Sequence, residues 1–237
     1  LSIRRQRQMC IRDSSWAARA KASHQRADQA LFGIVQGGID PALRVRSAEH
    51  LANLDFEGYG IGGLSVGESR VEMMPALNAA LSQLPANRPR YLMGVGDPAR
   101  IVDAIGAGVD MFDCVLPTRV ARNGTAFTKK GTISIKAGYN KRDWRPIEED
   151  CTCYACQHFT RAYLRHLLNV NEILGLRMLS VHNSHMYLAL MRDIRRHLDE
   201  GTFEAFRASF AATYRPTQKI LDQRAAHALR EQESPSN

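Results

Sequence analysis

Short apolar runs alternate with more polar segments through the first half of the chain. Apolar runs of strand length occupy residues 31–36 (LFGIVQ), 59–64 (YGIGGL), 91–95 (YLMGV) and 109–115. Helices are predicted after the first three, with one ending near residue 53 and one spanning 69–84. Asp40-Pro41 and Asp97-Pro98 each place an N-cap residue before a proline at the first helical position. This fourfold alternation predicts an α/β fold made of parallel βαβ units.

Glycines cluster after the predicted strands, which is where ligand-facing loops lie in such folds. Four units amount to half of a (β/α)8 TIM barrel, or to a small open sheet. The pattern of apolar residues alone does not choose between them.

The alternation ends after Gly124. Residues 126–136 (AFTKKGTISIK) predict a β-hairpin around Lys129-Lys130-Gly131. Apolar residues then recur at helical spacing in 159–174, 187–198 and 203–214, with a short strand-like run at 178–181. We interpret residues 1–14 as a disordered or foreign leader, expect a helix at about 15–26, and expect disorder in 230–237.

Composition and charge narrow the function classes. The chain has 237 residues, of which 44% are apolar, enough to fill a core. Its net charge of +8 favours a polyanionic partner, and nucleic acid is the first candidate. A basic protein without such a partner can have the same net charge. No apolar run approaches the roughly 20 residues of a membrane span, so we expect no membrane partner. The basic N-terminus lacks the apolar stretch of a secretory signal, so we expect a cytoplasmic protein.

Three of the five cysteines lie within six residues, in the pattern C-x-C-x₂-C formed by Cys151, Cys153 and Cys156. Such a cluster indicates a metal site in a reducing compartment rather than a set of disulfides. Three free thiols on a surface loop are the simpler alternative. We disfavour it because thiols this dense are rarely left without a ligand.

A closed tetrahedral site needs a fourth ligand. His158 and His166 are nearest in sequence, while His182 and His185 lie in the segment VHNSHM. We favour His182, because it follows a strand-like run and can fold back on the cysteines. A Cys₃His set has no open position, so it predicts one structural Zn²⁺.

Asp113 is the candidate catalytic residue, in the segment VDMFDCVLPTRVARNG at residues 109–124. It stands where the fourth strand should end, because Pro117 has no N–H for the ladder. Arg119 and Arg122 follow, and a carboxylate beside two guanidiniums suits a sugar-phosphate substrate. A free Asp, with a pKa of about 3.9, is ionised at neutral pH and can attack a sugar C1′. Taken alone, an Asp that caps a turn is the simpler interpretation.

Several long motifs together resemble one family, the tRNA-guanine transglycosylases or queuine tRNA-ribosyltransferases. They are FGIVQGG, GYGIGGLSVGE, YLMGVGDP, MFDCVLPTRVARNG, CTCYAC and EILGLRMLSVHN, in family order from about residue 15 to 214. The resemblance implies a (β/α)8 barrel with a zinc-binding insertion after its last strand. It assigns 15–125 to the C-terminal half of the barrel, 126–182 to the insertion and 183–229 to closing helices.

The resemblance also implies a reaction. The family replaces guanine at the anticodon wobble position of tRNAs with a GUN anticodon by a 7-deazaguanine precursor of queuosine. The exchange is a double displacement through a covalent Asp–ribose intermediate, and Asp113 matches the nucleophile. Gln36, Gly63 and Leu64 match positions that hydrogen-bond the base, Glu68 a pocket acid, and Met93 an apolar wall. Without the resemblance, Gln36 would be a capped strand end and Gly63 a tight turn.

Two segments match RNA contacts of the family: Gly94, Val95, Gly96, Asp97, Pro98, Ala99 and Arg100, and Thr118, Arg119, Val120, Ala121 and Arg122. The zinc ligands of the family match Cys151, Cys153, Cys156 and His182, which selects His182 among the histidines. Val66 matches the bacterial-type pattern, in which its side chain crowds a bulky base. It therefore favours preQ1 over queuine.

One departure from the family pattern concerns the general acid/base. The family's second catalytic aspartate lies near a Gly-Gly-Phe-Gln motif that this sequence does not contain. We therefore interpret the chain as a C-terminal fragment, and the family implies a possible homodimer. The alternative is a zinc-stabilised, non-catalytic tRNA-binding fragment or subunit, against which the retained Asp113 counts. A generic barrel enzyme for a small phosphorylated substrate fits the zinc insertion and the basic hairpin less well.

Overall fold

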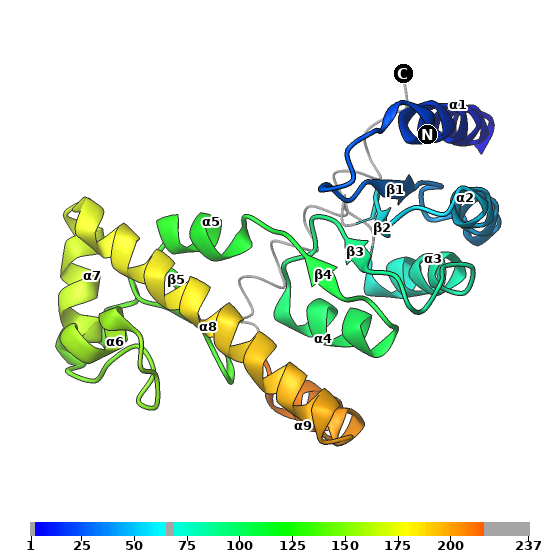
Figure 1. The fold of residues 1–237 in the computed structure, drawn as a ribbon. Helices are drawn as coiled ribbons and strands as arrows, with labels where there is room; N and C mark the ends of the chain where they lie inside the picture. Colours follow the sequence, from blue (N-terminus) through cyan, green and yellow to red (C-terminus); the bar gives the residue numbers. More distant parts are fainter. Residues whose placement is uncertain (1–2, 65–68, 216–237) are drawn as a thin grey trace. The chain divides into compact units, whose positions relative to one another are not determined.

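The structure is a computed structural model that describes residues 3–64 and 69–215, except for the side chains of residues 3–11 and 70. The chain divides into two compact units, the first ending at Cys114 and the second beginning at Val115. Figure 1 shows both. Among the described helices, none combines the length and the apolar character that crossing a membrane requires.

The first unit contains a four-stranded parallel sheet in the order β1-β2-β3-β4. Its strands are β1 (Phe32–Val35), β2 (Gly58–Ile61), β3 (Arg90–Leu92) and β4 (Met111–Phe112). The connecting helices are α2 (Pro41–Asn53), α3 (Arg70–Leu81) and α4 (Pro98–Gly106). Consecutive helices contact each other along one face of the sheet (Figure 1). The predicted βαβ units are therefore confirmed as a parallel α/β layer, and the described residues contain no closed barrel.

The core of this unit lies between the sheet and its helices. Strand β2 is buried along its whole length, with Tyr59 and Ile61 fully covered. Gly58 permits a close approach to the neighbouring strand, since a Cβ there would lie 2.3 Å from the Phe32 ring. Although its strands are short, the sheet is well buried, because both faces of β2 are enclosed, as is usual for parallel sheets.

Side-chain caps fix the helix starts that follow the strands. The Asp40 carboxylate accepts hydrogen bonds from the N–H groups of Ala42 and Leu43, at 2.9 and 3.1 Å. The Asp97 carboxylate accepts one from the Arg100 N–H at 3.2 Å. Both Asp-Pro predictions are thus confirmed. The caps also set where the loops after β1 and β3 must end.

The first helix is longer than we predicted. Helix α1 spans Ile3–Ser23, whereas we predicted disorder in residues 1–14 and a helix at about 15–26. The expected disorder was wrong from Ile3 onward. Residues 3–14 contain no Gly or Pro and several Arg and Gln, which are good helix formers. The last turn is tied to the sheet by Lys21, whose Nζ donates to Glu57 Oε1 at 3.1 Å.

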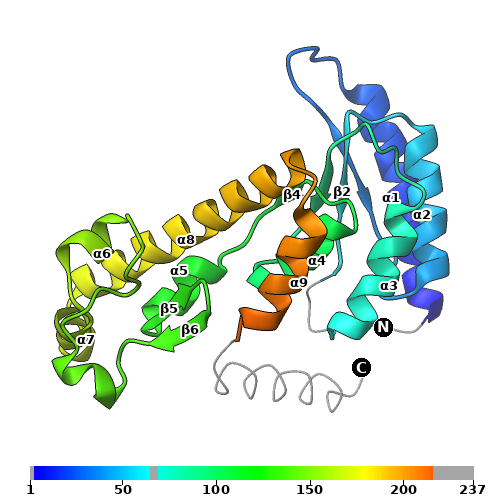
Figure 2. The ribbon, with the colours of Figure 1, turned by 90° about the horizontal axis from the view of Figure 1, so that it is seen from below.

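In its described residues, 115–215, the second unit combines a hairpin with six helical segments, and most of these elements can be followed in Figure 2. Strands β5 (Thr125–Thr128) and β6 (Gly131–Ser134) pair antiparallel and turn at Lys129-Lys130, as predicted. The helical segments are α5 (Leu116–Arg122), η1 (Gly138–Arg142), α6 (Tyr154–His158), α7 (Arg161–Asn169), α8 (Ile173–Asp199) and α9 (Phe203–Thr213).

Three predictions for this unit need correction. The helix expected at 159–174 is broken between α7 and α8, where Asn171 has a φ of 58°. The strand-like run 178–181 lies inside α8, because its apolar residues continue a helical face that a four-residue window cannot reveal. The boundary predicted at 182/183, between the zinc-binding insertion and the closing helices, lies within α8 and stays a prediction. Pro117, which we placed at a strand end, lies in the first turn of α5.

Asn183 connects α8 to α5 and β5 from a fully buried position. Its Oδ1 accepts a hydrogen bond from the Phe127 N–H at 2.9 Å. Its Nδ2 donates to the carbonyls of Pro117 and Thr125, at 2.9 and 3.1 Å. One amide thus bonds three backbone groups, one from α5 and two from β5.

Asn183→Ala should destabilise the second unit by about 3 kcal/mol, because it leaves a backbone N–H and two carbonyls without their partner. Urea unfolding followed by Trp144 fluorescence in a Trp16→Phe background reports this unit. Asn169→Ala, at the exposed end of α7, is the control and should change the stability by less than about 0.5 kcal/mol. Equal losses in the two variants would contradict the role of Asn183.

Candidate active site and metal centre

Asp113 lies directly after β4, beside two donors supplied by β3 and the loop that follows it. The Tyr91 hydroxyl donates to Asp113 Oδ1 at 2.7 Å, and the Gly94 N–H donates to the same oxygen at 2.9 Å. The parallel pairing of β3 with β4 brings these groups to one edge of the sheet. No other described residue donates a hydrogen bond to Oδ2, and Asp113 is exposed. Two neighbouring residues therefore hold one carboxylate oxygen and leave the other without a bond to them.

These contacts keep Asp113 ionised. The hydrogen bond from Tyr91, followed by that from the Gly94 N–H, lowers the pKa of Asp113 below its ordinary value. The same hydrogen bond raises the pKa of Tyr91. Asp113 therefore presents a negative charge at neutral pH without further activation. We did not predict Tyr91; the signal was its period-two spacing from Met93 in the apolar run 91–95, which in an extended chain places both side chains on one face.

Gln36 and Gly63 lie together at the ends of β1 and β2. A Cβ on Gly63 would lie 2.8 Å from Gln36 Oε1, and one on Gly62 would lie 3.0 Å from Gln36 Nε2. Gly63 has a φ of +67°, so this turn favours glycine twice, for its backbone angle and for the space beside the amide. The Gln36 amide thus rests against bare backbone, and its role in binding a base stays a prediction.

The other predicted base contacts have different surroundings. The Met93 N–H bonds the Ile61 carbonyl at 3.2 Å, which places Met93 beside the end of β2. Leu64 is only 3% exposed, so it belongs to the core. Glu68 and Val66 lie outside the described residues.

The two predicted RNA segments are only partly exposed. In the first, Val95, Gly96 and Pro98 are buried and Asp97 caps α4, whereas Gly94 is exposed with a φ of +75°. The second forms most of α5, in the second unit. There Ala121 is buried, while Arg119 and Arg122 are exposed.

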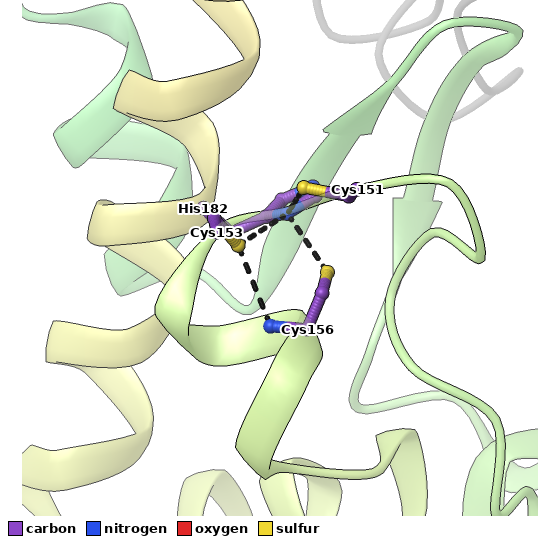
Figure 3. A group of neighbouring side chains, drawn as sticks. All are labelled: Cys151, Cys153, Cys156 and His182. Carbon is purple, nitrogen blue, oxygen red and sulfur yellow. Dashed lines mark hydrogen bonds between the residues drawn. The ribbon is translucent and has the colours of Figure 1, made fainter.

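The four predicted metal ligands meet in the second unit (Figure 3). His182 Nδ1 lies 3.7, 3.5 and 3.3 Å from the Sγ atoms of Cys151, Cys153 and Cys156. All four ligand atoms lie within 4.8 Å of one another. A tetrahedral zinc ion with ordinary bond lengths separates sulfur from nitrogen by about 3.6 Å. The donor set and its spacing therefore fit zinc.

His182 is oriented by the hairpin. Its Nε2 lies 2.7 Å from the Phe127 carbonyl, so Nε2 carries the proton and Nδ1 is left as a ligand. The residue is fully buried in the middle of α8. It reaches the cysteines from a helix and not, as we predicted, after a strand. His185 instead has its Nε2 3.5 Å from Thr152 Oγ1.

The cysteines are also arranged for metal binding. Cys153 caps α6, and its Sγ accepts the Cys156 N–H at 3.4 Å. The hydrogen bond from the Cys156 thiol is the largest cause that lowers the pKa of Cys153 to about 3, which favours the thiolate, the form that binds metal. The same bond raises the pKa of Cys156.

Comparison with known proteins assigns the family. Residues 2–216 match the family described as queuine tRNA-ribosyltransferase. The chain belongs to this family. The match confirms the resemblance, and it includes most of the segment that we had interpreted as a foreign leader.

Individual relatives agree with the family match. A protein from Desulforamulus reducens named queuine tRNA-ribosyltransferase is 49% identical over 203 residues, which are 86% of this chain and 55% of that protein. One of the same name from Thiobacillus denitrificans is 54% identical over 198 residues, 84% of this chain and 54% of the relative. A third protein of this name, from Symbiobacterium thermophilum, is 54% identical over 200 residues, which are 84% of this chain and 50% of that protein. The chain thus spans about half the length of these relatives.

Cys153→Ser should reduce the zinc content of the purified chain from about one ion to less than about 0.2, because one of four ligands is lost. Inductively coupled plasma mass spectrometry measures the metal. Cys114→Ser removes a thiol outside the cluster and should retain the full content. Undiminished zinc in Cys153→Ser would refute the ligand assignment.

Tyr91→Phe should raise the pKa of Asp113 toward its ordinary value of 3.8, because the largest cause of its depression is removed. Carbon-detected NMR titration of the Asp113 carboxyl measures this directly. Tyr154→Phe removes a hydroxyl from the second unit and should leave the titration unchanged. An unaltered pKa in Tyr91→Phe would mean that Tyr91 does not hold the carboxylate.

Proposed function

We propose that this chain provides the nucleophile, part of the base pocket and the zinc-bound part of a tRNA-guanine transglycosylase acting in queuosine biosynthesis. The observation that carries the proposal is the Asp113 carboxylate, ionised, exposed and held through one oxygen by Tyr91 and Gly94. Membership of the family supplies the substrate class, tRNA together with guanine-type bases.

The proposed reaction has two displacements at C1′ of the wobble nucleoside. The free Oδ2 of Asp113 attacks C1′, the bond from C1′ to the guanine nitrogen breaks, and guanine leaves with the bonding electrons and gains a proton. The incoming 7-deazaguanine then attacks C1′ through its own ring nitrogen and loses a proton. The Asp–C1′ ester bond breaks and the carboxylate is restored. The family's general acid/base aspartate, which this sequence does not contain, would move these protons.

The remaining residues position the substrates. Gln36 can both donate to and accept from a base edge, and Gly63 lets that edge approach the backbone. Met93 would form an apolar wall and Glu68 would face the donors of the base. Arg119 and Arg122 would bind phosphates beside the flipped nucleotide. Val66 favours preQ1 as the incoming base.

Zinc has a structural role in this proposal. Four protein ligands leave no open coordination position, so the ion would cross-link the loop before α6 to α8. We further propose a cytoplasmic protein, in keeping with reduced cysteines and a tRNA substrate, and a homodimer by analogy with the family.

A non-catalytic tRNA-binding subunit remains the second candidate function. A pure binder has no use for an exposed carboxylate held in one orientation by two donors, which favours the enzyme.

Asp113→Asn should reduce the incorporation of radiolabelled guanine into a GUN-anticodon tRNA by about 10⁴-fold or more, because an amide cannot form the ester. Binding of tRNA should remain within about threefold. The assay uses this chain mixed with the half of a relative that it does not match, and this chain alone. Asp199→Asn, at the exposed end of α8, is the control and should exchange normally. Loss of tRNA binding in Asp113→Asn would make Asp113 a structural residue, and persistent exchange would exclude it as the nucleophile.

A further inference from the structure

The segment between β6 and the metal-binding cysteines contains exposed cations and exposed large aromatic side chains within a few residues of one another in the sequence. We define residues 136–145 as the basic aromatic loop. Tyr139 and Trp144 are 72% and 75% exposed, and Lys141 and Arg142 between them are exposed as well. Aromatic side chains this open are seldom left in water without a partner.

Hydrogen bonds from Asn140 and Arg165 fix the backbone of the basic aromatic loop, so the loop is preorganised. Asn140 is fully buried, and its Nδ2 donates to the carbonyls of Ser134 and Ile135 at 2.9 and 3.2 Å. Arg165 Nε donates to the Ala137 carbonyl at 3.1 Å, which joins the loop to α7. Inward-facing groups fix the backbone, so the outward-facing side chains need little ordering when a partner binds.

The only carboxylate of the loop does not offset its outward charge. Asp143 accepts two hydrogen bonds from the Arg145 guanidinium, both at 2.9 Å, one from the Arg145 backbone N–H at 3.1 Å, and one from Arg161 Nη1 at 3.1 Å. Two guanidiniums thus already balance that charge. Lys141 and Arg142 make no ion pair with any residue in the described part of the chain. With that charge balanced, the exposed side chains of Lys141 and Arg142 leave the loop with a net positive charge.

The loop continues a basic surface that begins on α5. The Ile135 N–H bonds the Gly124 carbonyl at 2.8 Å, and a Cβ on Gly124 would lie 2.8 Å from Lys136 Cγ. The aliphatic part of the Lys136 side chain therefore lies against the backbone at Gly124, two residues after Arg122, the last residue of α5. Exposed cations run from α5 through Lys136 to the basic aromatic loop within one unit.

We propose that the basic aromatic loop is a second RNA-binding surface, separate from the two segments that the family resemblance assigns. Lys141 and Arg142 contact phosphates, and Tyr139 and Trp144 stack on unpaired bases. Stacking on aromatic side chains beside basic groups is the usual way in which proteins bind single-stranded RNA. The proposal rests on the proposed function for its ligand, tRNA, and the positive charge favours RNA over a second copy of this basic chain.

The first test measures how tRNA affinity depends on salt. The double variant Lys141→Ala/Arg142→Ala should reduce the slope of log affinity against log salt by about 1.4 to 1.8, the effect of two lost phosphate contacts. Arg177→Ala/Arg195→Ala removes the same charge from exposed positions on α8 and should leave the slope unchanged. Trp144→Ala should weaken binding about 5- to 150-fold, whereas Trp144→Phe keeps a stacking ring and most of the affinity.

The second test reports on Trp144 itself. The chain has two tryptophans, so Trp16→Phe leaves Trp144 as the sole reporter. Adding a GUN-anticodon tRNA transcript should quench its fluorescence and protect it from iodide, because a stacked base covers the ring. A merely structural Trp144 would show neither effect.

Two further measurements distinguish a failure of this proposal from a failure of the proposed function. They are the tRNA affinity of Arg122→Ala and the oligomeric state of each variant by analytical ultracentrifugation. Weaker binding in Arg122→Ala with no change in the loop variants overturns the second surface and leaves the proposed function intact. A change in dimer dissociation without a change in tRNA affinity assigns the loop to contact between copies, which overturns the proposal. A wild-type chain without tRNA affinity, alone or with the missing half of a relative, overturns both.

Discussion

Two neighbouring side chains on α8, His182 and Asn183, hold the second unit together. His182 directs Nδ1 at three sulfurs and Nε2 at the Phe127 carbonyl, while Asn183 binds the Phe127 N–H and the carbonyls of Pro117 and Thr125. Both residues are fully buried. One turn of one helix thus positions the metal ligands, the hairpin and α5. The exposed arginines of α5 depend on it, because their helix is fixed through the Pro117 carbonyl.

In the first unit the constraint is the parallel sheet. Its strands end at a common edge, so Tyr91, Gly94 and Asp113 come together although they are far apart in sequence. A low pKa makes a carboxylate a weaker nucleophile but a better leaving group. The proposed double displacement requires both roles of Asp113. Holding one oxygen with two donors is consistent with a site in which release of the ester must be as easy as its formation.

Local signals in the sequence predicted much of this architecture. The Asp-Pro caps, the apolar runs and the Lys129-Lys130 turn depend on neighbouring residues alone, so pattern and propensity were enough. The continuity of α8 was missed because residues 178–181 are apolar on several sides, and only their place in a 27-residue helix explains why. His182 was predicted as a ligand, but through the wrong local structure. Tyr91 was missed because its role exists only once β3 and β4 are paired.

The central claim, that Asp113 forms the covalent bond to tRNA, is tested most directly by mass spectrometry of the trapped intermediate. The chain, supplemented with the missing half of a relative, is mixed with tRNA in the absence of an incoming base, denatured, and digested with nuclease and protease. The account predicts a ribose-linked adduct on the peptide containing Asp113 that hydroxylamine removes. An adduct on a different carboxylate, or guanine exchange without any adduct, would contradict it.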